Sequence, residues 1–220
     1  MMRTPTAVPA LALAASLLAV PAITSAQSCN GAPMADGQFA LGAGAGFTKD
    51  LNDYGIGLQA NLRGPISLLA AYRNGDHDET ADPLHNYVGA VLYEVQASKF
   101  SVCPRVQITH SRFDGTHSGV ETKSNTNVIG LGVGIGRTFP TGTAVAISPF
   151  ILPEVMLVKT TGEVIAFGTT QEFDSDENGF GVTVGATFGV KRLMFTTTAQ
   201  FSNLTDSHPF YTIGLGFHFP

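Results

Sequence analysis

Tryptophan is absent from the 220-residue sequence, cysteine occurs only twice, and only 13% of the residues are charged. The 12 lysines and arginines are outnumbered by 17 aspartates and glutamates, so the formal net charge is -5. Because a nucleic-acid-binding protein needs a basic surface to neutralise phosphates, the sequence predicts no nucleic-acid partner. Beyond the first 26 positions there is no uncharged apolar run of about eighteen residues, which excludes a protein that crosses a membrane with helices.

The first 26 residues have the features of a signal peptide. Arg3 precedes an apolar stretch over residues 7–23, and the small residues Thr24, Ser25 and Ala26 follow it. Such a segment is removed after export. The alternative, an uncleaved membrane helix, is disfavoured by Pro9 and Pro21 within the apolar stretch and by the small residues at its end. We therefore predict a signal peptide over 1–26, a periplasmic N-terminal segment over 27–36 and one domain over 37–220.

Export changes the interpretation of the two cysteines. An oxidising compartment permits a disulfide, whereas the cytoplasm would favour a metal or catalytic role. The sequence therefore predicts that Cys29 pairs with Cys103, which would close a loop of about 74 residues. Two free thiols and a lipid-modified Cys29 are the alternatives.

Apolar and small or polar residues alternate along almost the whole predicted mature chain. Between Phe39 and Phe47 the odd positions are apolar, whereas the even positions carry only alanine and glycine. The same period of two returns over residues 54–62, 66–73, 129–136 and 180–189. A period of two is typical of strands whose two faces meet different surroundings. The sequence therefore predicts an all-β fold.

Ten strands are predicted, and their connections differ in length in a regular way. The expected strands are 37–47, 53–63, 65–73, 86–96, 100–112, 127–138, 143–159, 179–190, 193–202 and 209–219. Long polar connections at 74–85, 113–126 and 160–178 alternate with very short ones. Outer-membrane barrels have short periplasmic turns and longer external loops. The pattern thus predicts a closed antiparallel transmembrane barrel with both termini on the periplasmic side.

Three prolines within predicted strands complicate this count. Pro104, Pro149 and Pro153 each remove a backbone donor from the sheet. We expect bulges at these positions. A barrel of eight strands, with 143–159 partly a rim segment, is the alternative.

Aromatic residues recur at the two ends of the predicted apolar faces. Phe39 and Phe47 lie eight residues apart on one face, a rise of about 26 Å along a strand. At a tilt of about 40° this distance spans roughly 20 Å of bilayer, as the aromatic girdles of a membrane barrel do. The predicted girdle residues are Phe39, Phe47, Tyr54, Tyr72, Tyr87, Phe100, Phe180, Phe188, Phe195, Tyr211 and Phe219.

The final segment carries a resemblance to a known class of protein. Residues Phe210 to Phe219 alternate and close on an aromatic residue, which resembles the C-terminal strand of bacterial outer-membrane barrels, although Pro220 follows here. In pattern and size the chain is similar to the small OmpA-like and opacity-protein-like barrels. The resemblance implies a location in the bacterial outer membrane, contact with outer-membrane lipid and insertion by the outer-membrane assembly machinery.

The side chains on the inner face of the barrel determine whether its lumen is closed or forms a channel. Its predicted lining is glycine, threonine, serine and glutamine, because eight to ten strands enclose a space that side chains nearly fill. The predicted lumen charges are Arg63, Arg73, Glu94, Arg105 and Glu154. Pairing of these charges inside a closed lumen is favoured over a narrow polar channel, because an unpaired buried charge is costly.

Other candidate sites are weaker. Asp174, Asp176 and Asn178 match the first half of a calcium loop, but the carboxylate required at position twelve is missing, so an acidic external loop is expected. Four histidines, His77, His85, His117 and His208, map to the external end without metal-ligand spacing. We predict no cofactor, no metal site and no catalytic residue.

The sequence therefore predicts a monomeric outer-membrane β-barrel with a structural, adhesive or limited permeability role. A soluble exported barrel that binds an apolar ligand is the main alternative. An outer-membrane enzyme that modifies lipid is the other alternative, although no G-x-S-x-G motif occurs. The sequence leaves the ligand or adhesion target open.

Overall fold

The computed structural model describes residues 38–49, 51–62, 65–77, 80–97, 100–117, 119–140, 145–204 and 208–219, and in this part of the chain every regular element is a strand. No helix among these residues is long and apolar enough to cross a membrane. The strands are β1 Phe39–Phe47, β2 Leu51–Asn61, β3 Ile66–His77, β4 Thr80–Tyr93, β5 Val95–Ala97, β6 Phe100–His117, β7 Val120–Gly136, β8 Phe139–Pro140, β9 Val145–Ala166, β10 Thr169–Val190, β11 Leu193–Ser202 and β12 Phe210–Phe219.

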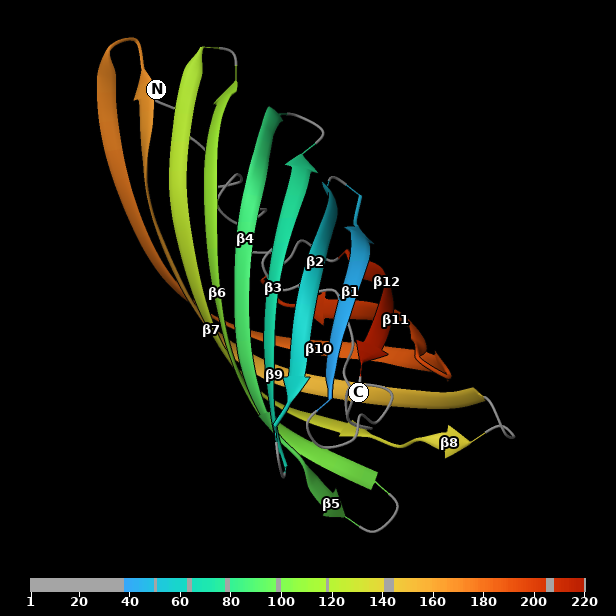
Figure 1. Cartoon of the computed structure of the whole chain (residues 1–220). Coiled ribbons are helices and arrows are strands. Elements are labelled where there is room, and N and C mark those ends of the chain that lie inside the picture. The colour runs from blue at the N-terminus through green and yellow to red at the C-terminus, as the bar shows by residue number, and fades with distance from the viewer. Residues whose placement is uncertain are drawn as a thin grey trace.

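The strands close into a barrel (Figure 1). Each long strand pairs antiparallel with its neighbour along the chain, and β1 pairs with β12 from Phe39 opposite Phe219 to Phe47 opposite Tyr211. Closure leaves no unpaired edge, which a barrel in hydrocarbon requires because lipid offers no hydrogen bonds to the backbone. The all-β closed antiparallel barrel predicted from the sequence is confirmed.

Two short strands continue longer ones, so the barrel has ten strands. β5 pairs with β6 in the same register as β4 does, and β8 pairs with β9 in the same register as β7 does. Each short strand is therefore the end of an interrupted strand. The prediction of ten strands is confirmed, and the alternative of eight is not.

Prolines explain both kinds of interruption. Pairing between β4 and β6 stops at Leu92, and the next residue, Tyr93, lies opposite Pro104. The gap between β7 and β8 begins at Arg137, opposite Pro149, and the β7–β9 ladder is also broken opposite Pro153. The register is the same on both sides of each break. A proline cannot donate its backbone nitrogen to the neighbouring strand, so the ladder lacks a bond at that point. The expectation of bulges at Pro104, Pro149 and Pro153 is wrong, because a bulge would have shifted the register.

Several strands run further than the sequence predicts. The residues expected to form long connections at 74–85, 113–126 and 160–178 instead pair in strands as far as His77 with Thr80, His117 with Val120 and Ala166 with Thr169. β9 and β10 meet at Phe167 and Gly168, both with positive φ, of 52° and 76°. Four strands, β6, β7, β9 and β10, therefore rise above the others on one side of the barrel (Figure 1).

Alternating burial shows which face of each strand is inside. On β9, for example, Phe150, Leu152 and Met156 are buried inside the barrel, whereas Ile151 and Leu157 are exposed outside it. Many large apolar side chains on the outer face are exposed, among them Ile108 at 59% and Leu215 at 58%. A soluble barrel would have the opposite arrangement, with its apolar face inside and its polar face in water.

The predicted signal peptide over 1–26 and the segment over 27–36 lie outside the described residues. Their boundaries stay predictions.

Candidate functional site

A belt of apolar side chains surrounds the barrel. We define the lipid-facing belt as the outward residues between the two levels of aromatic side chains, such as Leu58, Ile108 and Leu215. The aromatic residues predicted for the girdles all lie on the outward face, and among them only Phe219 is partly buried. At the seam between β1 and β12, the Phe39 ring stacks on Phe219 at 5.0 Å, and Phe47 stacks on Tyr211 at 5.8 Å. Rings that pair across strands at two heights form the arrangement expected of two membrane interfaces.

The upper level of aromatic side chains is also polar. The Asn74 amide donates a hydrogen bond to the Tyr54 hydroxyl at 2.8 Å, and the Tyr72 hydroxyl lies 2.8 Å from Nδ1 of His85. The Tyr72 and Tyr87 rings are 5.4 Å apart. Tyrosine suits a membrane interface because its ring is apolar and its hydroxyl needs a polar partner.

The lower level carries phenylalanine and arginine. Phe188 and Phe195 lie 6.3 Å apart on neighbouring strands. The guanidinium of Arg137 lies over the Phe100 ring at 5.8 Å and over the Phe139 ring at 4.6 Å. The sequence reasoning missed Arg137 and Phe139, which the pairing of β6, β7 and β9 brings next to Phe100.

The upper border of the lipid-facing belt is sharp on β7. Moving up the outer face, Leu131 and Ile129 are followed by the polar side chains Asn127 and Asn125. The strand register places His110 and Lys159 beside Asn127. Everything above this row on β6, β7, β9 and β10 is therefore outside the apolar belt.

A buried ion pair lies in the lumen. Arg73 on β3 donates a hydrogen bond through Nη2 to Oδ2 of Asp53 on β2, and both side chains are 1% exposed. The Phe210 ring covers the guanidinium at 5.3 Å. The prediction named Arg73 but missed Asp53. Asp53 opens a predicted strand, and its position opposite the inward face of β3 becomes evident only from the register.

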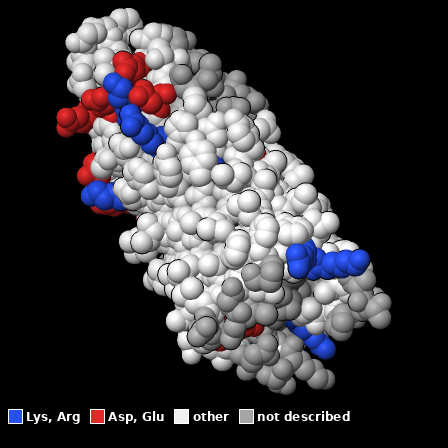
Figure 2. Space-filling model, in the orientation of Figure 1, with Lys and Arg blue, Asp and Glu red and all other residues white. Residues whose placement is uncertain are grey.

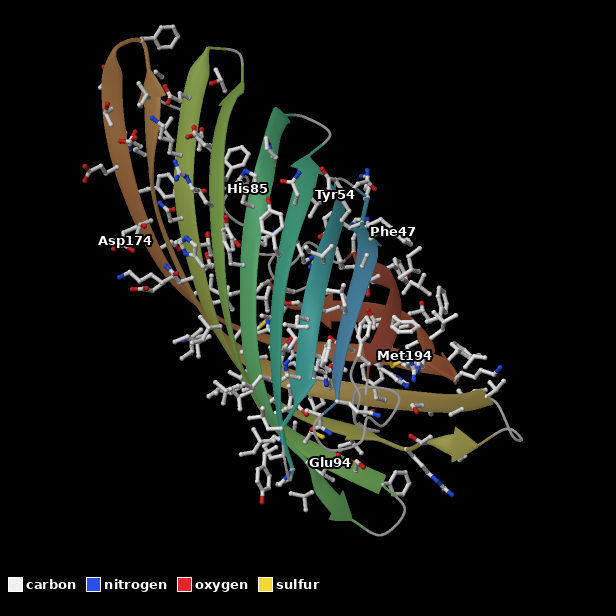
Figure 3. All side chains as sticks on the ribbon, in the orientation of Figure 1. Phe47, Tyr54, His85, Glu94, Asp174 and Met194 are labelled. Carbon is white, nitrogen blue, oxygen red and sulfur yellow. The ribbon has the colours of Figure 1, made fainter. Side chains whose placement is uncertain are left out.

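The other predicted lumen charges are distributed along the inner wall. Arg105 donates a hydrogen bond to Gln107, and Glu154 accepts one from Nε2 of Gln200 at 3.4 Å. Glu94 lies near the opposite end of the barrel from Asp174 (Figure 3), where it accepts a hydrogen bond from the Ser101 hydroxyl at 2.5 Å. Arg63 lies outside the described residues.

Apolar side chains also fill part of the lumen. Leu204, in the turn after β11, is buried with Val128, Met156 and Val158. Two further buried pairs lie at the upper end: Leu51 with Phe210, and Leu84 with Phe113. The lining predicted from the sequence, which contained only small and polar residues, is therefore incomplete. Leucine and valine on β4 and β9 occupy both faces of the strand, and alternation alone cannot tell such a strand from a lipid-facing one.

A sheet of four strands rises above the belt. We define the projecting wall as residues 111–117, 120–126, 160–166 and 169–175 of β6, β7, β9 and β10. It extends roughly 24 Å along the strands above the border row, at about 3.4 Å per residue. Acidic and basic side chains gather at this end of the molecule (Figure 2).

The outer face of the projecting wall carries a ladder of charges. Lys123 Nζ lies 2.6 Å from Glu121 and 3.6 Å from Glu163. The hydrogen bond to Glu121 and the charge of that carboxylate raise the pKa of Lys123. Lys159, just below, lies 3.7 Å from Asp174, which points away from the barrel (Figure 3).

The segment that matched half of a calcium loop is thus a regular strand. Asp174, Asp176 and Asn178 lie on the outer face of β10, each opposite a residue of β9. The expectation of an acidic external loop here is wrong, because the segment is paired throughout. Among the described residues, no three His, Cys, Asp or Glu side chains lie close enough together to hold a metal ion.

The inner face of the projecting wall forms an open groove. One row across the four strands contains Phe113, Ser124, Gly162 and Phe173. The Phe173 ring lies directly over Gly162, where any side chain would collide with it. A cavity of about 720 Å³ opens at this row, and it reaches around the wall, because its lining includes Phe113 and Phe173 of the inner face as well as Glu163 of the outer face.

Only one cysteine of the predicted disulfide lies in the described part of the chain. Cys103 is fully buried on the inner face of β6, and the described part of the chain contains no free cysteine. Cys29 lies outside the described residues. The pairing of the two stays a prediction.

No protein-family model and no curated protein matches the chain. Solved structures of similar architecture include a KdgM porin, with a TM-score of 0.40, 7% identity and coverage of 82% of this chain and 99% of that one. The N-terminal barrel domain of OprF from Pseudomonas aeruginosa matches with a TM-score of 0.37 and 10% identity over 84% of this chain and 100% of that one. The outer-membrane protease OmpT from Escherichia coli matches with a TM-score of 0.49 and 8% identity over 84% of this chain and 94% of that one.

The fold of this chain itself agrees with the resemblance inferred from its sequence. Ten antiparallel strands close into a barrel, and the apolar side chains lie on its outer face. The chain is thus similar in architecture to outer-membrane β-barrels.

Proposed function

We propose that the protein is an exported, monomeric barrel of the bacterial outer membrane that presents the projecting wall to the medium. The observation that carries the proposal is the lipid-facing belt, a closed band of exposed apolar side chains between two levels of aromatic residues. Burying such a band in water-excluding lipid gains hydrophobic free energy, whereas leaving it in water would promote aggregation. Outer-membrane lipid and the assembly machinery are the proposed partners.

A closed lumen fits the interior better than an open pore. The ion pair of Arg73 and Asp53, the Phe210 ring and the cluster around Met156 are all buried. Side chains that line a water-filled channel are in contact with water. We therefore propose that the barrel itself does not pass solutes and that its function resides outside the membrane.

The tip of the projecting wall supports a contact role. Phe167 is fully exposed and has a φ of 52°, a conformation that costs a bulky residue energy and favours glycine or asparagine. Nothing in the fold of the turn requires an aromatic side chain at this position. An exposed aromatic ring kept at a strained tip, above a groove that contains Phe113 and Phe173, is suited to adhesion to another surface.

Cysteine labelling of intact cells tests the membrane placement and the orientation together. In a Cys29→Ser, Cys103→Ser background, the Phe167→Cys variant should react with a maleimide that cannot cross the outer membrane. The matched control is Lys191→Cys, since Lys191 lies in the turn at the other end of the β10 strand and is also exposed. It should react only after the outer membrane is permeabilised.

Two results would overturn the proposal. Equal labelling of both variants in intact cells would show that the barrel is not inserted in this orientation. Recovery of the protein in the soluble periplasmic fraction without detergent would favour the soluble barrel instead.

A further inference from the structure

The upper part of β10 has an unpaired edge. Within the lipid-facing belt β10 pairs with β11, from Gly181 opposite Ser202 to Val190 opposite Leu193. Above Phe180, β9 is the only strand of the described residues that pairs with β10. The upper part of β10 therefore borders the projecting wall on one side (Figure 1). We define the free edge as residues 170–178 of β10.

The backbone of every second residue of the free edge points away from β9. Phe180 sets this orientation, because its N–H donates to Oδ1 of Asn203 at 2.7 Å and its carbonyl accepts from the Asn203 N–H at 3.1 Å. Asn203 directly follows β11, so these groups of Phe180 point to the open side. In an antiparallel strand this direction recurs at every second residue, and the register with β9 is unbroken here. The residues that present their N–H and C=O groups to the open side are exposed, and they are Thr170, Glu172, Asp174, Asp176 and Asn178.

Such an edge is a template for another extended chain. It offers N–H donors and C=O acceptors at a regular spacing, and an added strand satisfies them. Proteins commonly prevent this pairing with a proline, a bulge or a very short edge strand. The free edge contains no proline, its ladder to β9 has no bulge, and it continues over several turns of the pleat. The feature that remains to control pairing is its charge.

The charge of the free edge disfavours a second copy of the same chain. The side chains of Glu172, Asp174 and Asp176 all lie on the outer face of β10. Antiparallel pairing of two such edges around Asp174 would place Asp174 opposite itself and Glu172 opposite Asp176. Like charges directly opposite each other destabilise a pair of strands. Lys159 lies 3.7 Å from Asp174 and 4.0 Å from Asp176 and is the one cation that close to them among the described residues.

We propose that the free edge binds an extended segment of another protein by strand addition, and that this segment carries a basic side chain at every second position. The added strand runs antiparallel to β10, with its basic side chains opposite Glu172, Asp174 and Asp176. Its other side chains lie beside Phe173 on the inner face, where a β-branched residue pairs well with an aromatic ring. Backbone hydrogen bonds supply the affinity, and the alternating side chains supply the specificity.

This inference deepens the adhesive role proposed above. It rests on the proposed function for the external location of the projecting wall, whereas the free edge is a property of the fold. The predicted partner is an extended basic segment, because the carboxylates that repel a second copy attract lysine and arginine.

Binding of the peptide KVKVKVK to the detergent-refolded protein tests strand addition. Two modified peptides have the same charge: one is N-methylated at its lysine amides and the other at its valine amides. A lysine opposite Asp174 exchanges both backbone hydrogen bonds with it, so methylated lysine amides cannot donate, whereas the valine amides point away. By isothermal titration calorimetry, we expect the lysine-methylated peptide to bind at least about tenfold more weakly than the valine-methylated peptide.

Two variants of the free edge provide a matched control. Asp174→Pro and Asp174→Asn remove the same carboxylate, but only proline removes the N–H at the open side. Because this N–H does not bond to β9, a proline suits this edge position. We expect Asp174→Pro to bind KVKVKVK at least about tenfold more weakly than Asp174→Asn, because the proline ring also occupies the place of the incoming strand. The methylated peptides decide the question if the proline variant does not fold.

Two results would overturn the proposal. Equal affinity of the two methylated peptides would show that charge alone attracts them. A dimer of the refolded protein that Asp174→Pro dissociates would assign the free edge to a second copy of the chain. Neither measurement depends on a membrane, so failure of the strand addition is distinguishable from failure of the outer-membrane assignment, which the labelling of intact cells tests.

Discussion

Arg73 and Asp53 face each other inside the barrel, from neighbouring strands, with their charges fully enclosed. The nearest aromatic cover is the Phe210 ring, 5.3 Å from the guanidinium. The pair joins β2, β3 and β12 at the external end of the lumen. It therefore closes the interior at the height where the outer face changes from lipid-facing to polar.

Removing one member of this pair should destabilise the barrel more than removing both. Asp53→Ala leaves a buried guanidinium without its partner, and breaking a buried pair in this way costs about 3–5 kcal/mol. The double variant Asp53→Ala, Arg73→Met should recover a large part of that loss, because no uncompensated charge remains. Urea unfolding in lipid vesicles measures the free energies, and equal losses in the single and double variants would contradict the pairing.

An arginine in the middle of the lipid-facing belt should be costly. Leu215 is 58% exposed on the outer face of β12, halfway between Tyr211 and Phe219. Leu215→Arg is expected to reduce the unfolding free energy in vesicles by about 2–4 kcal/mol, the range for a cation at the bilayer midplane. The control is Thr161→Arg, because Thr161 lies on the projecting wall beside Asp174. This substitution should change the free energy of unfolding by less than about 1 kcal/mol. Similar losses for both variants would show that the belt lies in water.

Gly46 should tolerate no side chain, whereas Gly89 should tolerate one. A Cβ atom at Gly46 would lie 2.4 Å from the Phe210 ring and 2.6 Å from Oδ1 of Asp53. The Gly46→Ala substitution therefore displaces the Phe210 ring from its position over the Arg73 guanidinium. We expect a loss of about 1–3 kcal/mol, as for other overpacked interiors.

The matched control is Gly89→Ala on β4. No atom lies within 4 Å of a Cβ added there, and Gly89 faces outward. This substitution should be neutral or stabilise the strand by up to about 1 kcal/mol. A larger loss at Gly89 than at Gly46 would show that the inner and outer faces have been interchanged.

Phe167→Asn should stabilise the hairpin of β9 and β10. Asparagine followed by glycine suits a two-residue turn with positive φ at both positions, and Phe167 gains no packing that would compensate for its strain. Hydrogen–deuterium exchange of the hairpin amides should become slower in the variant. Faster exchange would mean that the aromatic ring packs against the wall and has a structural role.

The sequence was sufficient to predict the barrel but not how far its strands extend. Over residues 129–136 and 180–189, alternation of apolar and small residues predicted strands that the structure confirms. Over residues 161–166 and 169–172 both faces of β9 and β10 are at least partly exposed, so the period of two disappears there. Thr160 to Ala166 and Thr169 to Asp176 therefore resembled loops, although they pair residue by residue.

Inward residues were harder to predict than outward ones. The aromatic positions followed from spacing alone, because the bilayer imposes one distance on every strand. Asp53 and Leu204 depend on which residues lie across the lumen, and that is set by the register and by the turn after β11. Such contacts across the lumen form only in the closed barrel.

The seam between β1 and β12 makes completion of the barrel the last event that its topology allows. These strands lie at opposite ends of the sequence, and their pairing, from Phe39 with Phe219 to Phe47 with Tyr211, brings together residues separated by almost the whole mature chain. A contact between such distant residues carries a large entropic cost and forms slowly. A chain that lacks the final ten residues would thus form an open sheet with two edge strands whose backbone groups have no hydrogen-bond partners. Such a sheet is not stable in a lipid bilayer.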